Sequence, residues 1–178
     1  MSENYRFLIM SDTHGDIEHM SSIVDRHRLD CTNFFHLGDS EVSPYVINSL
    51  FLGVRGNCDY FAGLPASRDV PFPFGTVHLE HGHRYDGITD EYIDSLNCRI
   101  FLSGHTHRKL VRRTPKGVWV LNPGSLTRPR DGDLGSYLTC DVDPETGVLS
   151  SVIFHLVDPE TGIEFESFDG LKKFEKYL

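Results

Sequence analysis

The alternation of apolar and polar positions in the first hundred residues predicts strands separated by helices. Short continuous apolar runs predict buried strands, because a strand covered on both faces of a parallel sheet needs apolar side chains throughout. Helical spacing of apolar residues predicts helices over 16–28, 44–50 and 88–97. This alternation indicates a parallel sheet. The predicted strands cover 6–12, 33–38, 51–55, 76–80 and 99–103.

After Lys109 the sequence pattern predicts short strands joined by turns. Before that point, the Pro- and Gly-rich segment 64–75 indicates a loop with an edge strand. The sequence Asp-Pro-Glu-Thr-Gly occurs at 143–147 and again at 158–162, and its residues favour two similar hairpin turns. Segment 168–178 is compatible with a short helix or a tail. The predicted strands of this half cover 109–114, 118–122, 136–142, 148–157 and 163–168.

Polar clusters follow each of the five early strands. In open α/β sheets, ligands bind just beyond the carboxyl ends of the strands. Asp12 and His14 alternate, as do His105 and His107, and in an extended segment alternate side chains point the same way. The clusters therefore predict one convergent metal site. Its candidate ligands are Asp12, His14, Asp39, Asn57, His81, His105 and His107.

The number and charge of these ligands favour two metal ions and a phosphate substrate. If Asp39 bridges, each of two ions receives four protein ligands. Two divalent ions and two aspartates leave a site charge of about +2, which attracts an anionic phosphate ester more than a neutral peptide. Imidazole and carboxylate ligands suit several divalent metals. Mn²⁺ is the leading candidate, with Ni, Fe, Zn and Mg as alternatives.

Length, charge and cysteine spacing restrict the kinds of protein that this chain can be. A length of 178 residues predicts a single domain over 1–178. A net charge of −9 argues against bulk nucleic-acid binding. No apolar stretch reaches the length of a membrane span, and the N-terminus lacks the pattern of a signal peptide. Four widely spaced cysteines then predict free thiols and a cytoplasmic location. The expected partner is a small phosphate ester, with a homodimer or higher homo-oligomer left open.

The motif set resembles that of the calcineurin-like metallophosphoesterases. The resemblance covers residues 8–107, and Asn122-Pro-Gly-Ser125 followed by Arg128-Pro-Arg130 is similar to the YfcE-like phosphodiesterases. It implies a four-layer αββα sandwich of two mixed sheets, in the α/β (α+β) class. It also implies a dinuclear phosphodiesterase, a hydrolase in which a hydroxide bridging the metals attacks phosphorus. One ion is then held by Asp12, His14, Asp39 and His107, and the other by Asp39, Asn57, His81 and His105.

One motif position departs from the broad superfamily. There a His contacts the phosphate and can protonate the leaving group, whereas this chain has Cys58, as is usual in the YfcE-like branch. A thiol is a weaker acid than an imidazolium at neutral pH. We therefore expect diesters with good leaving groups as substrates. The candidate catalytic residues are Cys58, Asp59 and His83, and the candidate substrate contacts are Arg55, Asn57, His83, Arg128 and Arg130.

Two other functions fit the same motifs. A non-catalytic interaction scaffold could share the fold, because a fold alone does not establish activity. A phosphomonoesterase or nucleotidase could share the metal site. The complete set of seven ligands favours an enzyme over a scaffold, and Cys58 favours diesters over monoesters.

Overall fold

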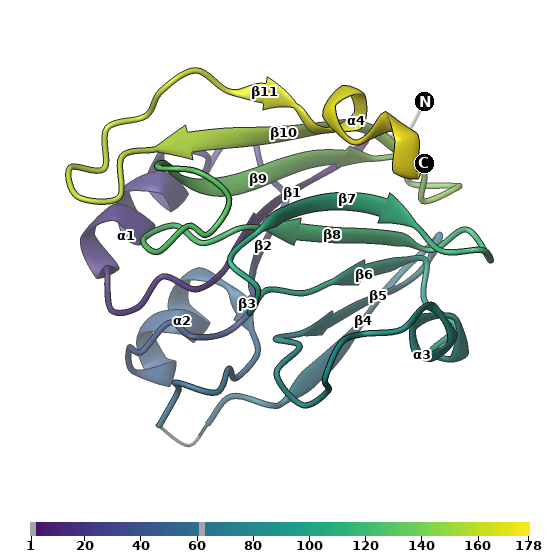
Figure 1. Cartoon of the computed structure of the whole chain (residues 1–178), viewed down its shortest axis with the longest axis horizontal. Helices are drawn as coiled ribbons and strands as arrows, with labels where there is room; N and C mark the ends of the chain where they lie inside the picture. Colours follow the sequence, from purple (N-terminus) through teal and green to yellow (C-terminus); the bar gives the residue numbers. More distant parts are fainter. Residues whose placement is uncertain (1–2, 61–62) are drawn as a thin grey trace.

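The chain forms two mixed sheets (Figure 1). The first has six strands and includes β1, β2 and β3, which precede the first three polar clusters. The computed structural model describes residues 3–60 and 63–178. The strand order is β11-β10-β9-β1-β2-β3. The strands β1, β2 and β3 are parallel, as predicted, and β9, β10 and β11 are antiparallel additions. Their bounds are Tyr5–Met10, Asn33–His36, Leu52–Gly53, Gly135–Val142, Leu149–Val157 and Phe168–Asp169.

The strands before the fourth and fifth polar clusters, β5 and β6, belong to a second sheet of five strands. Its order is β4-β5-β6-β8-β7, in which β5, β6 and β8 are parallel and the two edge strands are antiparallel. The predicted edge strand within 64–75 is β4. The bounds of β4 to β8 are Ser67–Phe72, Gly75–Glu80, Ile100–Leu102, Lys109–Arg113 and Trp119–Pro123.

Side chains of the two sheets meet in the main core. Phe7 and Ile9 of β1 and Phe35 of β2 face Leu79 of β5 and Leu102 of β6, all fully buried. The outer face of the first sheet packs against α1 and α2, and that of the second sheet against α3. The four-layer αββα sandwich is therefore confirmed. The helices are α1 at Ile17–Arg26, α2 at Pro44–Leu50, α3 at Asp90–Ser95 and α4 at Gly170–Lys173, followed by a 3₁₀ turn at Glu175–Tyr177.

Capping residues determine where the helices begin. Asp16 accepts a hydrogen bond from the backbone N–H of His19, and Ser43 and Thr89 cap α2 and α3 in the same way. Pro44 stands in the first turn of α2, where its missing N–H costs no hydrogen bond. All three helices follow a polar cluster at a strand end, and their caps fix the residue at which each helix starts.

The strand predicted over 163–168 is much shorter in the structure than expected. This segment makes one isolated bridge, between Val157 and Glu164, and β11 begins only at Phe168. Ile163 and Phe165 are more than half exposed, so the apolar pattern there does not mark a buried strand. Both Asp-Pro-Glu-Thr-Gly segments are turns, as predicted: the leading Asp accepts two backbone N–H groups in each.

The four cysteines are free thiols. Burial raises the pKa of Cys31 to about 12 and that of Cys98 to about 11, which disfavours the thiolate form of both. Among the described residues, no helix is long and apolar enough to span a membrane.

Candidate metal centre

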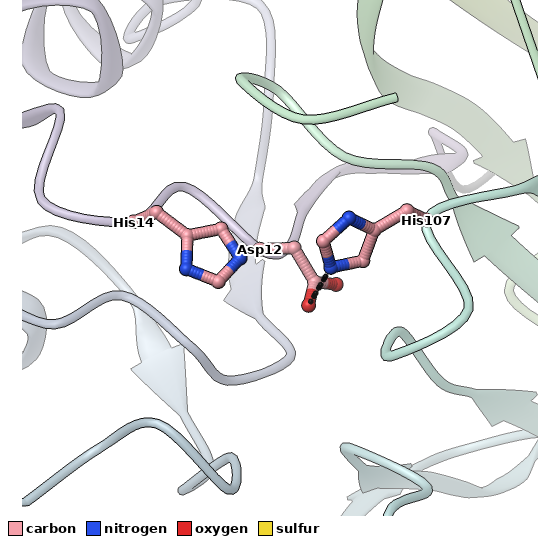
Figure 2. A group of neighbouring side chains, drawn as sticks. All are labelled: Asp12, His14 and His107. Carbon is pink, nitrogen blue, oxygen red and sulfur yellow. Dashed lines mark ion pairs between the residues drawn. The ribbon is translucent and has the colours of Figure 1, made fainter. Parts of the chain in front are cut away.

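Three side chains from loops that follow strands of the two sheets converge on one point (Figure 2). Asp12 follows β1, and His107 lies between β6 and β7. Candidate ligand atoms of Asp12, His14 and His107 all lie within 4.8 Å of one another. Nε2 of His107 is 3.1 Å from Oδ1 of Asp12. Two imidazoles thus flank one carboxylate, which is the ligand chemistry of a divalent transition metal.

A second group adjoins the first through its carboxylates. Candidate ligand atoms of Asp12, Asp39 and His81 also lie within 4.8 Å of one another. Oδ2 of Asp39 is 3.2 Å from Nε2 of His81, and Oδ1 of Asn57 is 3.0 Å from the same nitrogen. The ring of His105 is 5.1 Å from that of His81, centroid to centroid. The structure therefore brings together all seven candidate ligands.

Asp39 belongs to the second group and also reaches His14 of the first group. Besides its place beside Asp12 and His81, it has a ligand atom within 4.8 Å of those of His14 and Cys58. One oxygen, Oδ1, accepts a hydrogen bond of 2.8 Å from the backbone N–H of Cys58. This location suits a carboxylate that contacts two ions.

Three of the candidate histidines have their Nδ1 atoms fixed by hydrogen bonds. The Nδ1 atom of His81 lies 2.7 Å from the carbonyl oxygen of Leu37, and that of His107 lies 2.6 Å from the carbonyl of Arg128. In His14, Nδ1 is 2.9 Å from a carboxylate oxygen of Glu41. Partners of this kind orient metal-binding imidazoles and leave Nε2 free to coordinate. The three Nε2 atoms are accordingly available to the centre.

Two buried polar atoms at the centre lack a hydrogen-bond partner among the described residues. They are Oδ1 of Asp12 and Nε2 of His14. The contact of Asp12 Oδ1 with His107 is close, but its geometry is not that of a hydrogen bond. A buried polar atom without a partner is costly, and a metal ion would satisfy both atoms. The residues present therefore fit a bound divalent cation.

The backbone geometry of the ligand pairs differs from the extended form expected from the sequence. Positive φ angles occur at Asp12 (53°), His14 (44°), Asp39 (57°), His105 (68°) and His107 (58°). This left-handed region is uncommon for residues other than glycine, although Asp and His enter it more readily than most, and such conformations cluster at functional sites. Tight turns, not extended strand ends, thus bring the alternate side chains together.

Two glycines allow the loops around the centre to approach closely. A Cβ atom on Gly56 would lie 2.1 Å from Oδ1 of Asp39, and one on Gly104 would lie 2.0 Å from Oγ of Ser11. Neither position leaves room for a side chain. Gly56 and Gly104 therefore allow their loops to pack closely against the neighbouring loops that carry ligands.

Asp59 has a different position from the ligands. Its carboxylate accepts hydrogen bonds from the backbone N–H groups of Asp39 and Gly56, both at 2.8 Å, and of Glu41 at 2.9 Å. These bonds tie the loop that carries Asp39 to the loop that carries Asn57. The geometry of Asp59 is that of a positioning residue.

The charges at the centre are mutually stabilising. Burial raises the pKa of Asp39, but the hydrogen bond and the charge of His81 outweigh burial and leave that pKa lowered. For His81, burial lowers the pKa, and contacts with Asp39 and the charge of Asp12 leave it raised. Burial, followed by the nearby His81, lowers the pKa of His105. A cation that binds between these groups would pair with the same carboxylates, so metal binding and protonation of His81 compete.

An open cavity of about 390 Å³ lies over the centre, which we call the substrate cavity. Asp12 and His81 are buried beneath it, and Cys58, Arg128 and Arg130 contribute to its lining. The candidate metal ligands that line this cavity are His14, Asp39, Asn57, His105 and His107. Two guanidinium groups at the cavity suit an anionic ligand.

Two of the predicted substrate contacts lie elsewhere. Arg55 is exposed and does not line the substrate cavity. His83 lines a neighbouring cavity, with its ring 5.4 Å from that of His81 and 6.3 Å from that of His105. Its Nδ1 is buried and has no partner among the described residues.

Sequence reasoning missed the residues that hold the ligand loops. Asn122 donates hydrogen bonds to the carbonyl of Gly104 and to Thr106, and Ser125 donates to the carbonyl of Asp12 at 2.7 Å. The Asn-Pro-Gly-Ser motif was the signal that marked this segment. Glu41, which fixes His14, carried no signal of its own in the sequence.

Comparison with known proteins identifies the family. The model of the calcineurin-like phosphoesterase superfamily domain matches residues 5–145. The probable metallophosphoesterase YsnB of Bacillus subtilis is 29% identical over 154 residues, which cover 78% of this chain and 86% of that protein.

Solved structures share the fold. A protein of Streptococcus pneumoniae TIGR4 described as a predicted phosphoesterase superposes with a TM-score of 0.76 at 25% identity, covering 95% of this chain and 99% of that one. An archaeal phosphodiesterase superposes with a TM-score of 0.65 at 19% identity, covering 85% of this chain and 99% of that one.

The chain belongs to the calcineurin-like phosphoesterase superfamily. Membership of this family supports a hydrolase of phosphate esters, and the ligand groups described above fit the binding of divalent metal.

Proposed function

We propose that this protein is a phosphodiesterase whose centre holds two divalent ions, with Mn²⁺ as the first candidate. The observation that carries the proposal is the joining of two ligand groups through Asp12 and Asp39 at the floor of a cavity with two arginines. By this proposal, one ion is held by Asp12, His14, Asp39 and His107, and the other by Asp39, Asn57, His81 and His105.

Bound divalent ions supply an activated water and positive charge against the phosphoryl oxygens. The chain's own residues do the remaining work. His14, His81 and His107 are held at Nδ1, so their Nε2 atoms need no reorientation on binding. Arg128 and Arg130 line the substrate cavity and are the proposed contacts of the phosphate oxygens, since a guanidinium matches them with paired N–H groups.

Cys58 determines the preference for diesters with good leaving groups. Its side chain lines the substrate cavity, where the superfamily motif has a His. A thiol is a weaker acid at neutral pH than the imidazolium it replaces. The thiol therefore gives a departing oxygen little help, and substrates whose leaving groups are stable as anions are favoured. Alkyl monoesters lack such leaving groups.

Removal and restoration of metal test the proposal. Protein stripped of metal by a chelator is expected to lose hydrolysis of bis(p-nitrophenyl) phosphate, and added Mn²⁺ is expected to restore it. A non-catalytic scaffold would bind metal without turnover. Hydrolysis that is absent at every Mn²⁺ concentration, or equal with and without metal, would contradict the proposal.

A further inference from the structure

A second cavity adjoins the metal centre and has no role in the chemistry described so far. We call it the side cavity, and its volume is about 530 Å³. His105 lines both the side cavity and the substrate cavity. Gly82 and His83, which directly follow the candidate ligand His81, form part of its wall. A phosphate ester bound at the centre therefore has this cavity within reach of one substituent.

The side cavity has an apolar lining away from the metal centre. Phe101 and Val120 are buried side chains that line it from the second sheet. Ile88 and Leu110 are half-buried side chains that also contribute to its walls. Tyr85 is 43% exposed and packs against Tyr92, with 4.8 Å between ring centroids. Apolar and aromatic walls favour a flat, apolar group that leaves water on binding.

His83 is one polar group of the side cavity whose buried Nδ1 has no partner among the described residues, whereas Arg112 and Asn122 already have partners and Asp86 is negatively charged. The guanidinium of Arg112 is paired with Asp90. The side-chain amide of Asn122 donates to Gly104 and Thr106. Asp86, which also lines the cavity, would repel a second anionic group. The group that fits is therefore uncharged.

The size of the side cavity also limits its occupant. Pockets for small organic ligands enclose roughly 300–1,000 Å³. A volume of about 530 Å³ falls in that range and exceeds what a phosphate group alone would fill. A group as large as a fused pair of rings is a suitable occupant.

We propose that the side cavity binds a neutral aromatic ester arm of the phosphodiester substrate. The inference rests on the proposed function, because the phosphate must sit on the metal centre for its arm to enter this cavity. It specifies the substrate class as a phosphodiester that carries at least one uncharged aryl or heteroaryl alcohol.

Two non-hydrolysable phosphonates that differ only in their arm test the inference. We expect calorimetry with the Mn²⁺-loaded protein to give at least about tenfold tighter binding of (1-naphthyl)methylphosphonate than of methylphosphonate. Leu110→Trp, which places an indole in the side cavity, is expected to abolish this advantage and to leave methylphosphonate binding unchanged. Ile163→Trp is the matched control, since Ile163 is 61% exposed and does not line the cavity.

A smaller variant provides a second test. Ile88→Ala removes wall area without filling the cavity, and it is expected to weaken binding of the aryl phosphonate selectively. Equal affinity of wild-type protein for the two phosphonates would overturn the inference while leaving the proposed function intact. An aryl advantage that persists in both Leu110→Trp and Ile88→Ala would do the same. Failure of both phosphonates to bind the loaded protein would overturn the inference and the proposed function together.

Discussion

Replacing Asp39 with asparagine is expected to lower Mn²⁺-dependent diester hydrolysis by roughly 10³-fold. Asp39 is the carboxylate with ligand atoms close to both groups, since it lies near His14 of the first group and His81 of the second. An amide keeps the shape and can still accept the hydrogen bond from the N–H of Cys58. It removes the negative charge that two neighbouring cations require. The loss should therefore appear in metal binding and turnover rather than in folding.

The variant is best measured as kcat/KM on bis(p-nitrophenyl) phosphate over a range of Mn²⁺ concentrations. Asp25→Asn is the matched control, because Asp25 lies on α1 with an exposed carboxylate paired to Arg28. This control is expected to keep wild-type activity. If Asp39→Asn kept full activity, Asp39 would not be part of the catalytic centre.

Replacing Cys58 with histidine is expected to raise hydrolysis of alkyl phosphate monoesters by roughly 10²-fold, the contribution of a positioned proton donor. The Cys58 side chain lines the substrate cavity beside Asp39. An imidazole there would offer an N–H to the departing oxygen. Activated diesters need no such help, so their hydrolysis is expected to change less than about tenfold.

The informative quantity is the ratio of kcat/KM for the two substrate types. Cys58→Ser is the control, because a hydroxyl removes the thiol without supplying a proton donor comparable to imidazole. It should leave the ratio near the wild-type value. A diester-to-monoester ratio that stays unchanged in Cys58→His would mean that this position does not set the leaving-group preference.

Much of the fold follows from local pattern. The continuous apolar runs of β1, β2, β5 and β6 predicted buried strands because both of their faces are covered in the sandwich. The bounds of α2 were predicted as observed, since Ser43 and Pro44 give an unambiguous helix start. The division of the strands between two sheets came from the family resemblance. It depends on long-range pairing, such as that of β1 with β9, which no local pattern encodes.

The candidate ligands could be predicted from the sequence because several chemically distinct residues occur together at strand ends. Their backbone geometry could not, because a positive φ at Asp12 or His105 reflects loop closure against distant segments. Glu41 and Asp59 likewise act through contacts with other loops. The side cavity was also invisible, since it is formed by the packing of segment 82–88 against β6, β7 and β8.

We propose that two ions bound by the seven ligand side chains make this protein a phosphodiesterase. The sharpest test of this proposal is the activity of metal-stripped protein measured against the number of Mn²⁺ ions bound per chain, counted by elemental analysis after gel filtration. We expect diester hydrolysis to rise with bound metal and to reach its plateau at about two ions per chain. Full activity without bound metal, or a plateau at one ion, would contradict it.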